Sequence, residues 1–580
     1  MGSATDGVDT AAAELKAAEL AKARAAGWTE TVAFNYDEFQ RQGDYEWLGN
    51  AKVYEWSEEY GDVAPGHPEL ERQLYGGEDR VTAGDHRKVL DEIEVAIEGP
   101  TKVAPIQNFE DGGLHPVVLE NIQRCGYGKP TPIQAYTIPA VKLGYDVVGI
   151  AQTGSGKTAS YLIPIISGLM GKAKKLRAPR PNVTDPRYDP KQHRVRAEPL
   201  VLILVPTREL AVQVFDEARR LCYRSMLRPC VAYGGFPMGQ QIDDLGKGCD
   251  ILIGSCGRLM DLMDKPDVLS MNRVKYTVID EADELLNEDW SEEMLKILGG
   301  GDANDDADHI FMMFSATFPK GARRVAREYM ADDHFRIRVG RAGQAHKNIT
   351  QAIIEVDGIN KREAVYDLLF AQDPARTLIF CNSKPGVDQL DDFLYNKGLP
   401  TTSIHSDRNP REREDALRSF KTGRTPILIA TGVSARGWDV SNVAHVINYD
   451  MPSAMYGGIQ EYIHRIGRTA RIGNRGLATS FYNERNEDIA QDLVNVLVEC
   501  EQEVPDFLSH LKPEPTEIQF DDNSDDEADG EGFGGEDGGA AWGAESGDAA
   551  PAEPADNGFQ ADAGFSANHS SKPAAAADGW

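Results

Sequence analysis

A glycine-rich segment with the sequence AQTGSGKT, Ala151 to Thr158, has the residue types that bind phosphate groups. The Lys157 ammonium can reach the β/γ oxygens of a nucleotide, and the Thr158 hydroxyl can bind Mg²⁺ at the start of a following helix. The backbone amides that can surround a β-phosphate belong to Gly154, Ser155, Gly156 and Lys157. The alternative is an ordinary strand-to-helix turn, but the strand-like DVVGIA before it favours a phosphate site.

An acidic sequence follows a second strand-like run, because KYTVID leads directly into Asp280, Glu281, Ala282 and Asp283. A carboxylate at the end of a buried strand can hold Mg²⁺ through water, which is the role expected of Asp280. The neighbouring Glu281 can polarise an attacking water. Acidic residues are also common at helix N-termini, but together with the phosphate loop they predict nucleotide hydrolysis.

These groups need a scaffold, and short β-branched runs alternate with helix-length segments along most of the chain. The first set of strand-like runs consists of DVVGIA, LVLILV, DILIG, KYTVID and HIFMMFSAT. The second consists of TLIFCN, TTSIH, PILIAT, VAHVINYD and GLATSFY, with a helix expected from Arg411 to Lys421. This alternation predicts two successive α/β domains with parallel sheets.

Composition agrees with a globular protein that carries extensions. The 580 residues, 41% hydrophobic and 27% charged, suit two or three folded units. The net charge of −32 would argue against a polyanionic partner, but residues 521–580 hold fifteen acidic residues and only Lys572, so −14 lies in that tail. We expect the tail to be disordered, with Trp542 and Trp580 either solvated or part of a short docking motif.

Two other segments stand outside the domain pattern. Residues 11–26 predict an Ala-rich helix, followed by an acidic stretch without periodicity. Residues 171–199 contain several prolines and nine Lys or Arg against three acids, which predicts a surface loop. Its KAKKLR sequence is either a nuclear localisation signal or a loop beside a nucleic-acid path. The seven scattered cysteines and the lack of a long apolar run predict an intracellular protein away from membranes.

Seven segments in one order resemble the signature set of the DEAD-box RNA helicases. They are GYGKPTPIQ, AQTGSGKT, PTREL, DEAD, SAT, ARGWD and HRIGRTAR. The resemblance runs from about Glu92 to Leu511, and the stretch EIEVAIEGPTKVAPIQNFED with the basic insertion is similar to the Vasa-like branch. It implies two RecA-like domains at 105–345 and 352–511, an N-terminal extension over 1–104 that is partly disordered, and a disordered acidic tail over 512–580.

The resemblance also implies roles in ATP binding and hydrolysis. Gln134 would read the adenine edge through its amide, which can donate and accept at once. Tyr127 would stack on the base, while Phe109 is either a second aromatic at the base or a core residue. Lys157, Asp280 and Glu281 would act with Arg468 and Arg471 at the γ-phosphate. Asp439 is implied as a further nucleotide contact. The implied Mg²⁺ ligands are Thr158 and Asp280.

RNA binding and its coupling to hydrolysis are implied at other positions. The implied RNA contacts are Arg208, Gly234, Gly235, Arg258 and Thr431. The implied coupling residues are Ser315, Ala316 and Thr317, with His464 and Arg465 expected to touch the first domain. Contacts of this kind reach phosphates and 2′-hydroxyls, so RNA binding would not depend on base sequence.

The chain departs from the family pattern at Cys256, Ser406, Gly432 and Ala470, and the loop between Pro452 and Glu461 is about four residues longer. These changes lie on the side that grips RNA or closes the domains, which leaves a second interpretation open. The first is an ATP- and Mg²⁺-dependent RNA helicase that acts as a monomer and meets protein partners through its extensions. The second is an ATP-dependent RNA clamp with little unwinding; a DNA helicase has no support in these motifs.

Overall fold

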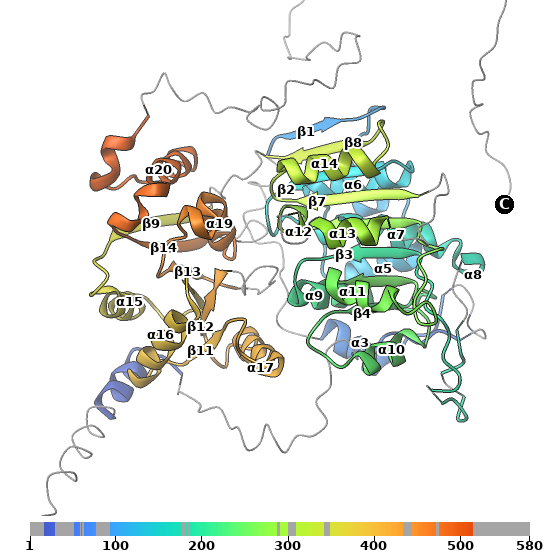
Figure 1. The fold of residues 1–580 in the computed structure, drawn as a ribbon, viewed down its shortest axis with the longest axis horizontal. Coiled ribbons are helices and arrows are strands. Elements are labelled where there is room, and N and C mark those ends of the chain that lie inside the picture. The colour runs from blue at the N-terminus through green and yellow to red at the C-terminus, as the bar shows by residue number, and fades with distance from the viewer. Residues whose placement is uncertain are drawn as a thin grey trace, which may run out of the picture. The chain divides into compact units, whose positions relative to one another are not determined.

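A computed structural model gives the structure of the chain. It describes residues 17–29, 51–57, 60, 63–76, 93–176, 180–183, 185–189, 191–286, 291–299, 309–340, 348–432, 442–470 and 475–513. Most of the predicted acidic tail, including Trp542 and Trp580, lies outside these residues. In the described ranges, helices and strands alternate and build two separate sheets (Figure 1).

The first sheet contains eight strands within the described residues, in the order β1-β8-β2-β7-β6-β3-β5-β4. Its strands are β1 (Val95–Glu98), β2 (Val147–Ala151), β3 (Val201–Leu204), β4 (Pro229–Ala232), β5 (Ile251–Gly254), β6 (Tyr276–Asp280), β7 (Ile310–Ser315) and β8 (Phe335–Val339). Neighbouring strands are parallel except for the β1–β8 pair. The five strands predicted in this domain are confirmed, and β1, β4 and β8 add to them.

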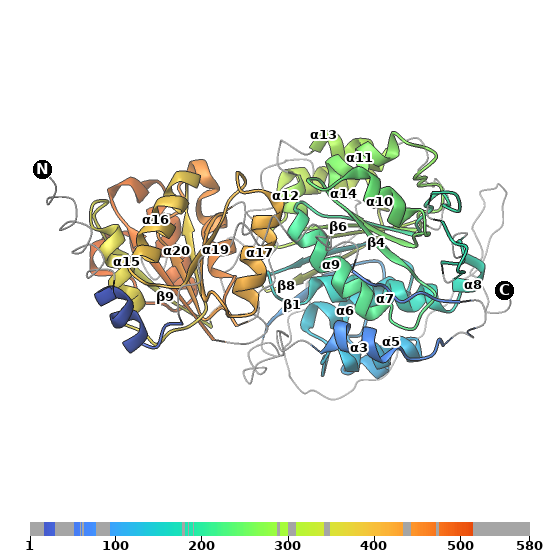
Figure 2. The same ribbon diagram turned by 90° about the horizontal axis from the view of Figure 1, so that it is seen from below.

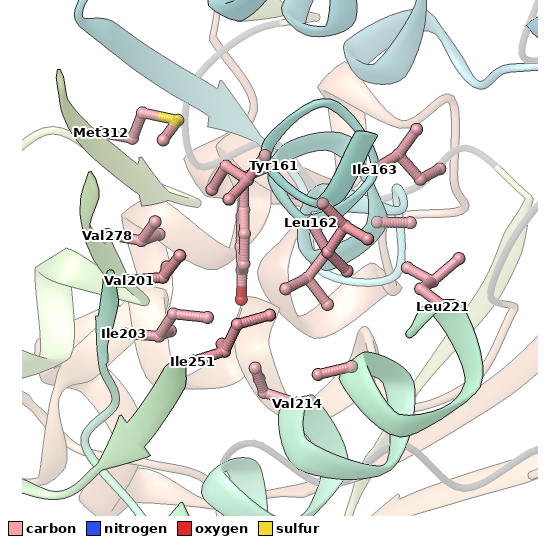
Figure 3. Packing of buried hydrophobic residues seen from close by; sticks show 14 of the residues in the cluster. Tyr161, Leu162, Ile163, Val201, Ile203, Val214, Leu221, Ile251, Val278 and Met312 are labelled. Atoms are coloured by element: carbon pink, nitrogen blue, oxygen red, sulfur yellow. The ribbon is translucent and has the colours of Figure 1, made fainter. Parts of the chain in front are cut away.

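Helices cover both faces of this sheet (Figures 1 and 2). One face carries α5 (Pro116–Arg124), α6 (Pro132–Lys142), α7 (Lys157–Met170) and α9 (Arg208–Leu221), and the other α10 (Met238–Leu245), α11 (Cys256–Met263), α13 (Ser291–Leu298) and α14 (Lys320–Tyr329). Successive residues of a strand point to opposite faces. Val201 and Ile203 therefore pack with Tyr161 of α7 (Figure 3), while Leu202 and Leu204 enter the core on the other face.

The second sheet has six parallel strands within the described residues, in the order β11-β12-β10-β13-β14-β9. They are β9 (Ile349–Glu355), β10 (Thr377–Cys381), β11 (Thr401–Ile404), β12 (Ile427–Thr431), β13 (His445–Asn448) and β14 (Gly476–Tyr482). Its helices are α15 (Lys361–Phe370), α16 (Lys384–Asn396), α17 (Pro410–Lys421), α19 (Gly458–Ile466) and α20 (Ala490–Glu499). The five predicted strands and the predicted helix at α17 are confirmed. The α/β parallel-sheet class is thus confirmed for both domains.

Short helical turns complete both domains. They are η2 (Phe109–Gly112), α8 (Ala173–Leu176), α12 (Ala282–Leu285), η3 (Ala454–Tyr456), η5 (Glu484–Ile489) and η6 (Asp506–Leu511). No helix among the described residues is both long enough and apolar enough to cross a membrane. Strands β1 and β9 begin just before the predicted domain ranges 105–345 and 352–511, so each sheet reaches slightly further toward the N-terminus.

Described parts of the N-terminal extension pack on both domains. Residues 17–25 are helical, as predicted, and Ala23 and Trp28 are buried in the core beside α15. The Glu19 carboxylate accepts a hydrogen bond from the Tyr366 hydroxyl at 2.7 Å. Further along, α3 (Pro68–Tyr75) and its neighbours pack around Tyr223 of the first domain.

The described parts of the basic insertion begin after α7 and lead into the start of β3. The amino end of β3 is opposite the strand ends that carry the predicted RNA contacts. Figure 1 shows α8 and α12 at opposite ends of the first sheet. The 14-residue α7 separates the described start of the insertion from the phosphate loop, and a loop beside the RNA path stays a prediction. The first turn of the insertion, α8, is helical because it precedes the prolines.

Candidate functional site

The glycine-rich loop connects β2 to α7 and is held from behind by α6. Gly154 and Gly156 have φ angles of +76° and +89°, a region that side chains other than glycine rarely adopt. A Cβ atom at Gly156 would also lie 2.5 Å from Nε2 of Gln134. That amide donates to the Gly156 carbonyl at 3.1 Å, and its Oε1 accepts from the Thr131 N–H at 3.0 Å. Gln134 therefore lies against the glycine-rich loop and holds it in place through a hydrogen bond.

Lys157 is the first residue of α7 and is only 5% exposed. Its Nζ donates to Oε2 of Glu281 at 3.1 Å, so the two predicted catalytic groups meet directly. Burial alone would lower the pKa of Lys157, but the carboxylates of Glu281, Asp283 and Asp280 outweigh it and raise the pKa. The ammonium is therefore charged at neutral pH and suits a phosphate ligand.

Asp280 ends β6 and faces the start of α7. Its Oδ2 accepts from the Tyr161 hydroxyl at 2.8 Å and lies 3.5 Å from Oγ1 of Thr158. Burial and the neighbouring Glu281 raise the pKa of Asp280 to about 6. A bound cation would favour the ionised form.

The hydroxyl and carboxylate oxygens of Thr158 and Asp280 are ligands that suit Mg²⁺. Among the described residues, no three His, Cys, Asp or Glu side chains form a metal cage. Mg²⁺ usually takes one or two protein oxygens and completes its shell with water and substrate phosphates. The pair therefore fits a magnesium ion that arrives with a nucleotide.

Glu281 follows with a φ angle of +50°, which is uncommon for a residue with a side chain. This strained conformation turns the chain sharply from β6 into α12, with Glu281 as the residue before the helix. The turn leaves the carboxylate near Lys157 instead of continuing along the strand. Strain of this kind costs on the order of 1–3 kcal/mol and is concentrated at functional sites.

Asp283 links the acidic segment to the predicted coupling segment at the end of β7. Its carboxylate accepts from both the backbone N–H and the hydroxyl of Thr317, at 3.1 and 2.9 Å. The Asp283 N–H donates to Oγ of Ser315 at 3.1 Å. Ala316 between them is buried. Burial would raise the pKa of Asp283, but His464, Lys157 and these hydrogen bonds lower it.

The helix α19 carries His464, and the turn after it carries Arg468. Nε2 of His464 lies 4.0 Å from Oδ2 of Asp283, which agrees with the predicted contact to the first domain. Burial lowers the pKa of His464. The Nε of Arg468 donates to the His464 carbonyl at 3.0 Å and its side chain is largely buried. Arg471 and Asp439 lie outside the described residues.

The predicted contact of Arg465 with the first domain is wrong. Its guanidinium points into its own domain, where it pairs with Glu461 one helical turn earlier at 2.8 Å. It also donates to the Asp450 carbonyl at 2.8 Å and to Oδ1 of Asn382 at 3.0 Å. The i,i+4 spacing on α19 and the buried carboxylate explain this direction.

The two predicted base-stacking aromatics line one hollow of about 340 Å³, together with Gly126 and Gly128. Phe109 is only 2% exposed and belongs to the first-domain core. The core-packing alternative for Phe109 therefore holds, although one edge faces the hollow. Tyr127 is half-buried, and its hydroxyl donates to Oε1 of Glu217 on α9. Burial and this carboxylate raise the pKa of Tyr127 well above its usual value.

Predicted RNA contacts follow the carboxyl ends of three neighbouring strands of the first sheet. Arg208 begins α9 after β3, Gly235 follows β4, and Arg258 lies on α11 after β5. A Cβ atom at Gly235 would lie 2.3 Å from the Arg208 guanidinium, so that group packs directly on the glycine. A Cβ atom at Gly234 would lie 4.0 Å from the same guanidinium. Burial and the nearby Arg413 lower the pKa of Arg208.

Arg258 and Thr431 are held by different parts of the fold. Both terminal nitrogens of Arg258 donate to the Phe236 carbonyl at 3.2 Å, which ties α11 to the loop after β4. Thr431 is the last residue of β12 in the second sheet. The Glu209 carboxylate pairs with Arg413 of α17 beside Arg208. The structure thus brings Arg208, Gly235 and Arg258 to one sheet edge, while Thr431 belongs to the edge of the other sheet.

Tyr161 and Glu217 were not predicted from the sequence, and Asp283 was named there without a role of its own. Tyr161 lies four residues after Lys157, a spacing that puts both on one side of α7, and this signal was available. Asp283 belongs to the predicted acidic segment, but its hydrogen bonds with Thr317 are known only from the fold. Glu217 carries no motif at all, and its contact with Tyr127 arises from the packing of α9.

Comparison with known proteins identifies both domains. The DEAD/DEAH box helicase family matches residues 131–325, and the helicase conserved C-terminal domain matches residues 360–473. The solved structure of S. cerevisiae Dbp5 bound to RNA and ADP BeF3 is 24% identical, covers 68% of this chain and 93% of its own, and has a TM-score of 0.55. That likeness confirms the RecA-like fold.

Other solved structures share more of the sequence. A DEAD box protein from the hyperthermophile Methanococcus jannaschii is 33% identical over 69% of this chain and 98% of its own, with a TM-score of 0.39. The RNA-helicase Prp28 from Chaetomium thermophilum, bound to ADP, is 28% identical over 73% of this chain and 96% of its own, with a TM-score of 0.37.

Proposed function

The chain belongs to the DEAD-box helicase family, and from this premise we propose that it is an RNA-dependent ATPase that unwinds short RNA duplexes or remodels RNA–protein complexes. The observation that carries the proposal is the meeting of Lys157 and Glu281 at 3.1 Å, where β2 and β6 end at the same edge of one sheet. This edge also holds the Asp283–Thr317 contact, so the hydrolytic and coupling groups are adjacent.

ATP would bind with its phosphates in the loop before α7 and its base near Tyr127 and Gln134. Lys157 would exchange Glu281 for the β/γ-phosphates, which frees the Glu281 carboxylate to orient and deprotonate the attacking water. Thr158 and Asp280 would hold Mg²⁺, which neutralises phosphate charge when bound. Arg468, with Arg471, would stabilise charge that develops on the γ-phosphate.

RNA would cross the sheet edges that carry Arg208, Gly234, Gly235, Arg258 and Thr431. These positions offer guanidinium groups, a hydroxyl and exposed backbone, which suit phosphates and ribose hydroxyls and carry little base information. The Asp283 carboxylate would transmit the state of the γ-phosphate to Ser315 and Thr317, so that hydrolysis and RNA release are linked.

The clamp interpretation is not favoured. A clamp needs ATP binding without turnover, whereas the groups expected to act on water and phosphate are present in this chain and closely paired in the first domain. The four departures Cys256, Ser406, Gly432 and Ala470 leave these groups untouched. We expect them to change the efficiency of unwinding instead of abolishing hydrolysis.

The proposal extends to the branch of the family, the oligomeric state and the compartment. We place the chain in the Vasa-like branch on the stretch EIEVAIEGPTKVAPIQNFED, part of which forms β1. We propose that it works as a monomer and recruits protein partners through residues 1–104 and 512–580. An intracellular site, in the cytoplasm or nucleus, is supported by its seven buried free thiols.

Strand displacement tests the proposal. The full chain with ATP should release the short strand of an RNA duplex, and Glu281→Gln should bind ATP and RNA but release little. The matched control is Glu284→Gln, which changes an acid of the same segment outside the predicted site. Equal displacement by Glu281→Gln and the unaltered chain would refute the role given to Glu281.

A further inference from the structure

A buried ion pair in the second domain lies directly against backbone. Glu461 and Arg465 are 4% and 3% exposed, and Nε of Arg465 lies 2.8 Å from Oε1 of Glu461. Both belong to α19, one turn apart. Buried pairs of this kind are costly to desolvate and are retained where geometry makes use of them.

The backbone beneath the pair is Gly432, the residue after β12. A Cβ atom at this position would lie 2.1 Å from Oε1 of Glu461 and 2.8 Å from Nη2 of Arg465. Gly432 is not among the glycines with a positive φ angle. Glycine is therefore needed here for space and not for its backbone freedom, since any side chain would collide with the Glu461 carboxylate.

The same guanidinium ties α19 to the ends of two more strands. Arg465 donates to the Asp450 carbonyl after β13 and to Oδ1 of Asn382 after β10. Asn382 in turn donates from its backbone to the Asp450 carboxylate at 3.1 Å and from its amide to the Met451 carbonyl at 2.7 Å. The pair thus joins the ends of β10, β12 and β13 to one helix.

The elements joined in this way carry different parts of the proposed site. Thr431, a proposed RNA contact, immediately precedes Gly432 at the end of β12. His464 stands on α19 and lies 4.0 Å from Asp283, while Arg468 follows two residues after the end of the helix and donates to the His464 carbonyl. A shift of the Gly432 backbone would therefore displace α19 and, through the His464 carbonyl, Arg468; a shift of Arg468 would act on Gly432 in the same way.

We propose that Glu461 is a positioning residue, which holds Arg465 against Gly432 and so couples the RNA contact at Thr431 to Arg468. The Glu461 carboxylate also occupies the space that the Cβ atom of a side chain at position 432 would need. A carboxylate can therefore be supplied from either position but not from both. This inference rests on the proposed RNA-dependent ATPase activity.

A charge-exchange experiment tests this inference. The full chain and the variants Gly432→Asp, Glu461→Ala and Gly432→Asp/Glu461→Ala are compared in RNA-stimulated ATP hydrolysis, with kcat and the half-saturating RNA concentration measured below each variant's melting temperature. Gly432→Asp places two carboxylates in one space, and Glu461→Ala leaves a buried guanidinium without its charge partner. We expect each single change to raise the half-saturating RNA concentration by about tenfold, and the double change to restore most of it.

Asp415→Ala is the matched control, because Asp415 forms a more exposed i,i+3 pair with Arg418 at 3.9 Å in the same domain. It should leave both parameters unchanged. If Glu461→Ala lowers only the melting temperature and leaves the RNA dependence intact, the pair is purely structural and the inference is wrong. It is also wrong if the double variant is as impaired as the worse single variant.

Folding failure also gives a decisive result. Should either single variant fail to fold, recovery of both folding and RNA stimulation in the double variant would support the inference, and a double variant that does not fold or is not stimulated would overturn it. If RNA fails to stimulate the unaltered chain, the proposed function fails, which is a separate outcome from unchanged variants on a stimulated background.

Discussion

Asp283→Ala should uncouple RNA binding from ATP hydrolysis while leaving ATP binding in place. The Asp283 carboxylate accepts two hydrogen bonds from Thr317 and lies 4.0 Å from His464, but it is not a proposed ligand of the nucleotide. Its loss therefore breaks the link between the acidic segment after β6 and the turn after β7.

The magnitude follows from those contacts. Each hydrogen bond to a charged acceptor contributes roughly 1.5–3 kcal/mol, so loss of the two bonds from Thr317 weakens the local arrangement by about 3–6 kcal/mol. Allosteric couplings in proteins are typically about 1–3 kcal/mol. If about 2 kcal/mol of the lost contact appears in the coupling, RNA stimulation of the ATPase falls by about 30-fold.

Two assays separate coupling from binding. Hydrolysis is measured with and without single-stranded RNA, and ATP affinity is measured with a fluorescent nucleotide. Asp283→Asn is the matched variant, because its amide oxygen can still accept from Thr317 without the charge, and we expect a smaller loss. Undiminished RNA stimulation in Asp283→Ala would refute the reasoning, as would a loss of ATP affinity as large as the loss of stimulation.

Three further predictions concern other parts of the chain. Burial lowers the pKa of His445 to about 4, so the unfolded state binds a proton first as the pH falls from 6.5. The second domain should lose about 3 kcal/mol of unfolding free energy by pH 4; urea titrations of His445→Gln should show a flatter dependence, and an unchanged slope would contradict it. Ala470 has a φ angle of +56°, so Ala470→Gly should raise the unfolding free energy by roughly 0.5–1 kcal/mol; calorimetry showing a lower melting temperature would oppose this. Trp28 is buried beside Tyr366, so Trp28→Ala should weaken docking of residues 17–29 by roughly 3–5 kcal/mol, and limited proteolysis within that segment should accelerate; equal cleavage rates would show that the contact is unimportant.

Most of the strands that the sequence predicted lie inside a sheet and consist of buried residues; the half-buried edge strand β11 is the exception. Parallel strands inside a two-sided sheet read as continuous apolar runs, as β6 and β12 do. The missed strands lie at or next to sheet edges. In β8 and β9 buried residues alternate with more exposed ones, and β4 begins with Pro229, which is tolerated on an edge strand. Such patterns resemble loops until the sheet is known.

The site residues could be predicted from the sequence where a motif directly follows a strand-like run. The phosphate loop and the acidic segment each follow a strand, so their residues had to meet at one sheet edge. The direction of Arg465 was not predictable in the same way, because its place in a motif suggested contact with the first domain. Its partner Glu461 is local, one turn earlier on α19, but Asp450 and Asn382 follow β13 and β10, which only the folded domain brings to this helix.

The proposed activity is measured first as the steady-state ATPase rate of the full chain with and without single-stranded RNA, beside Lys157→Ala to exclude contaminating activity. We expect hydrolysis that RNA stimulates and that the substitution abolishes. Hydrolysis that is indifferent to RNA, or that survives in Lys157→Ala, would contradict the proposed activity.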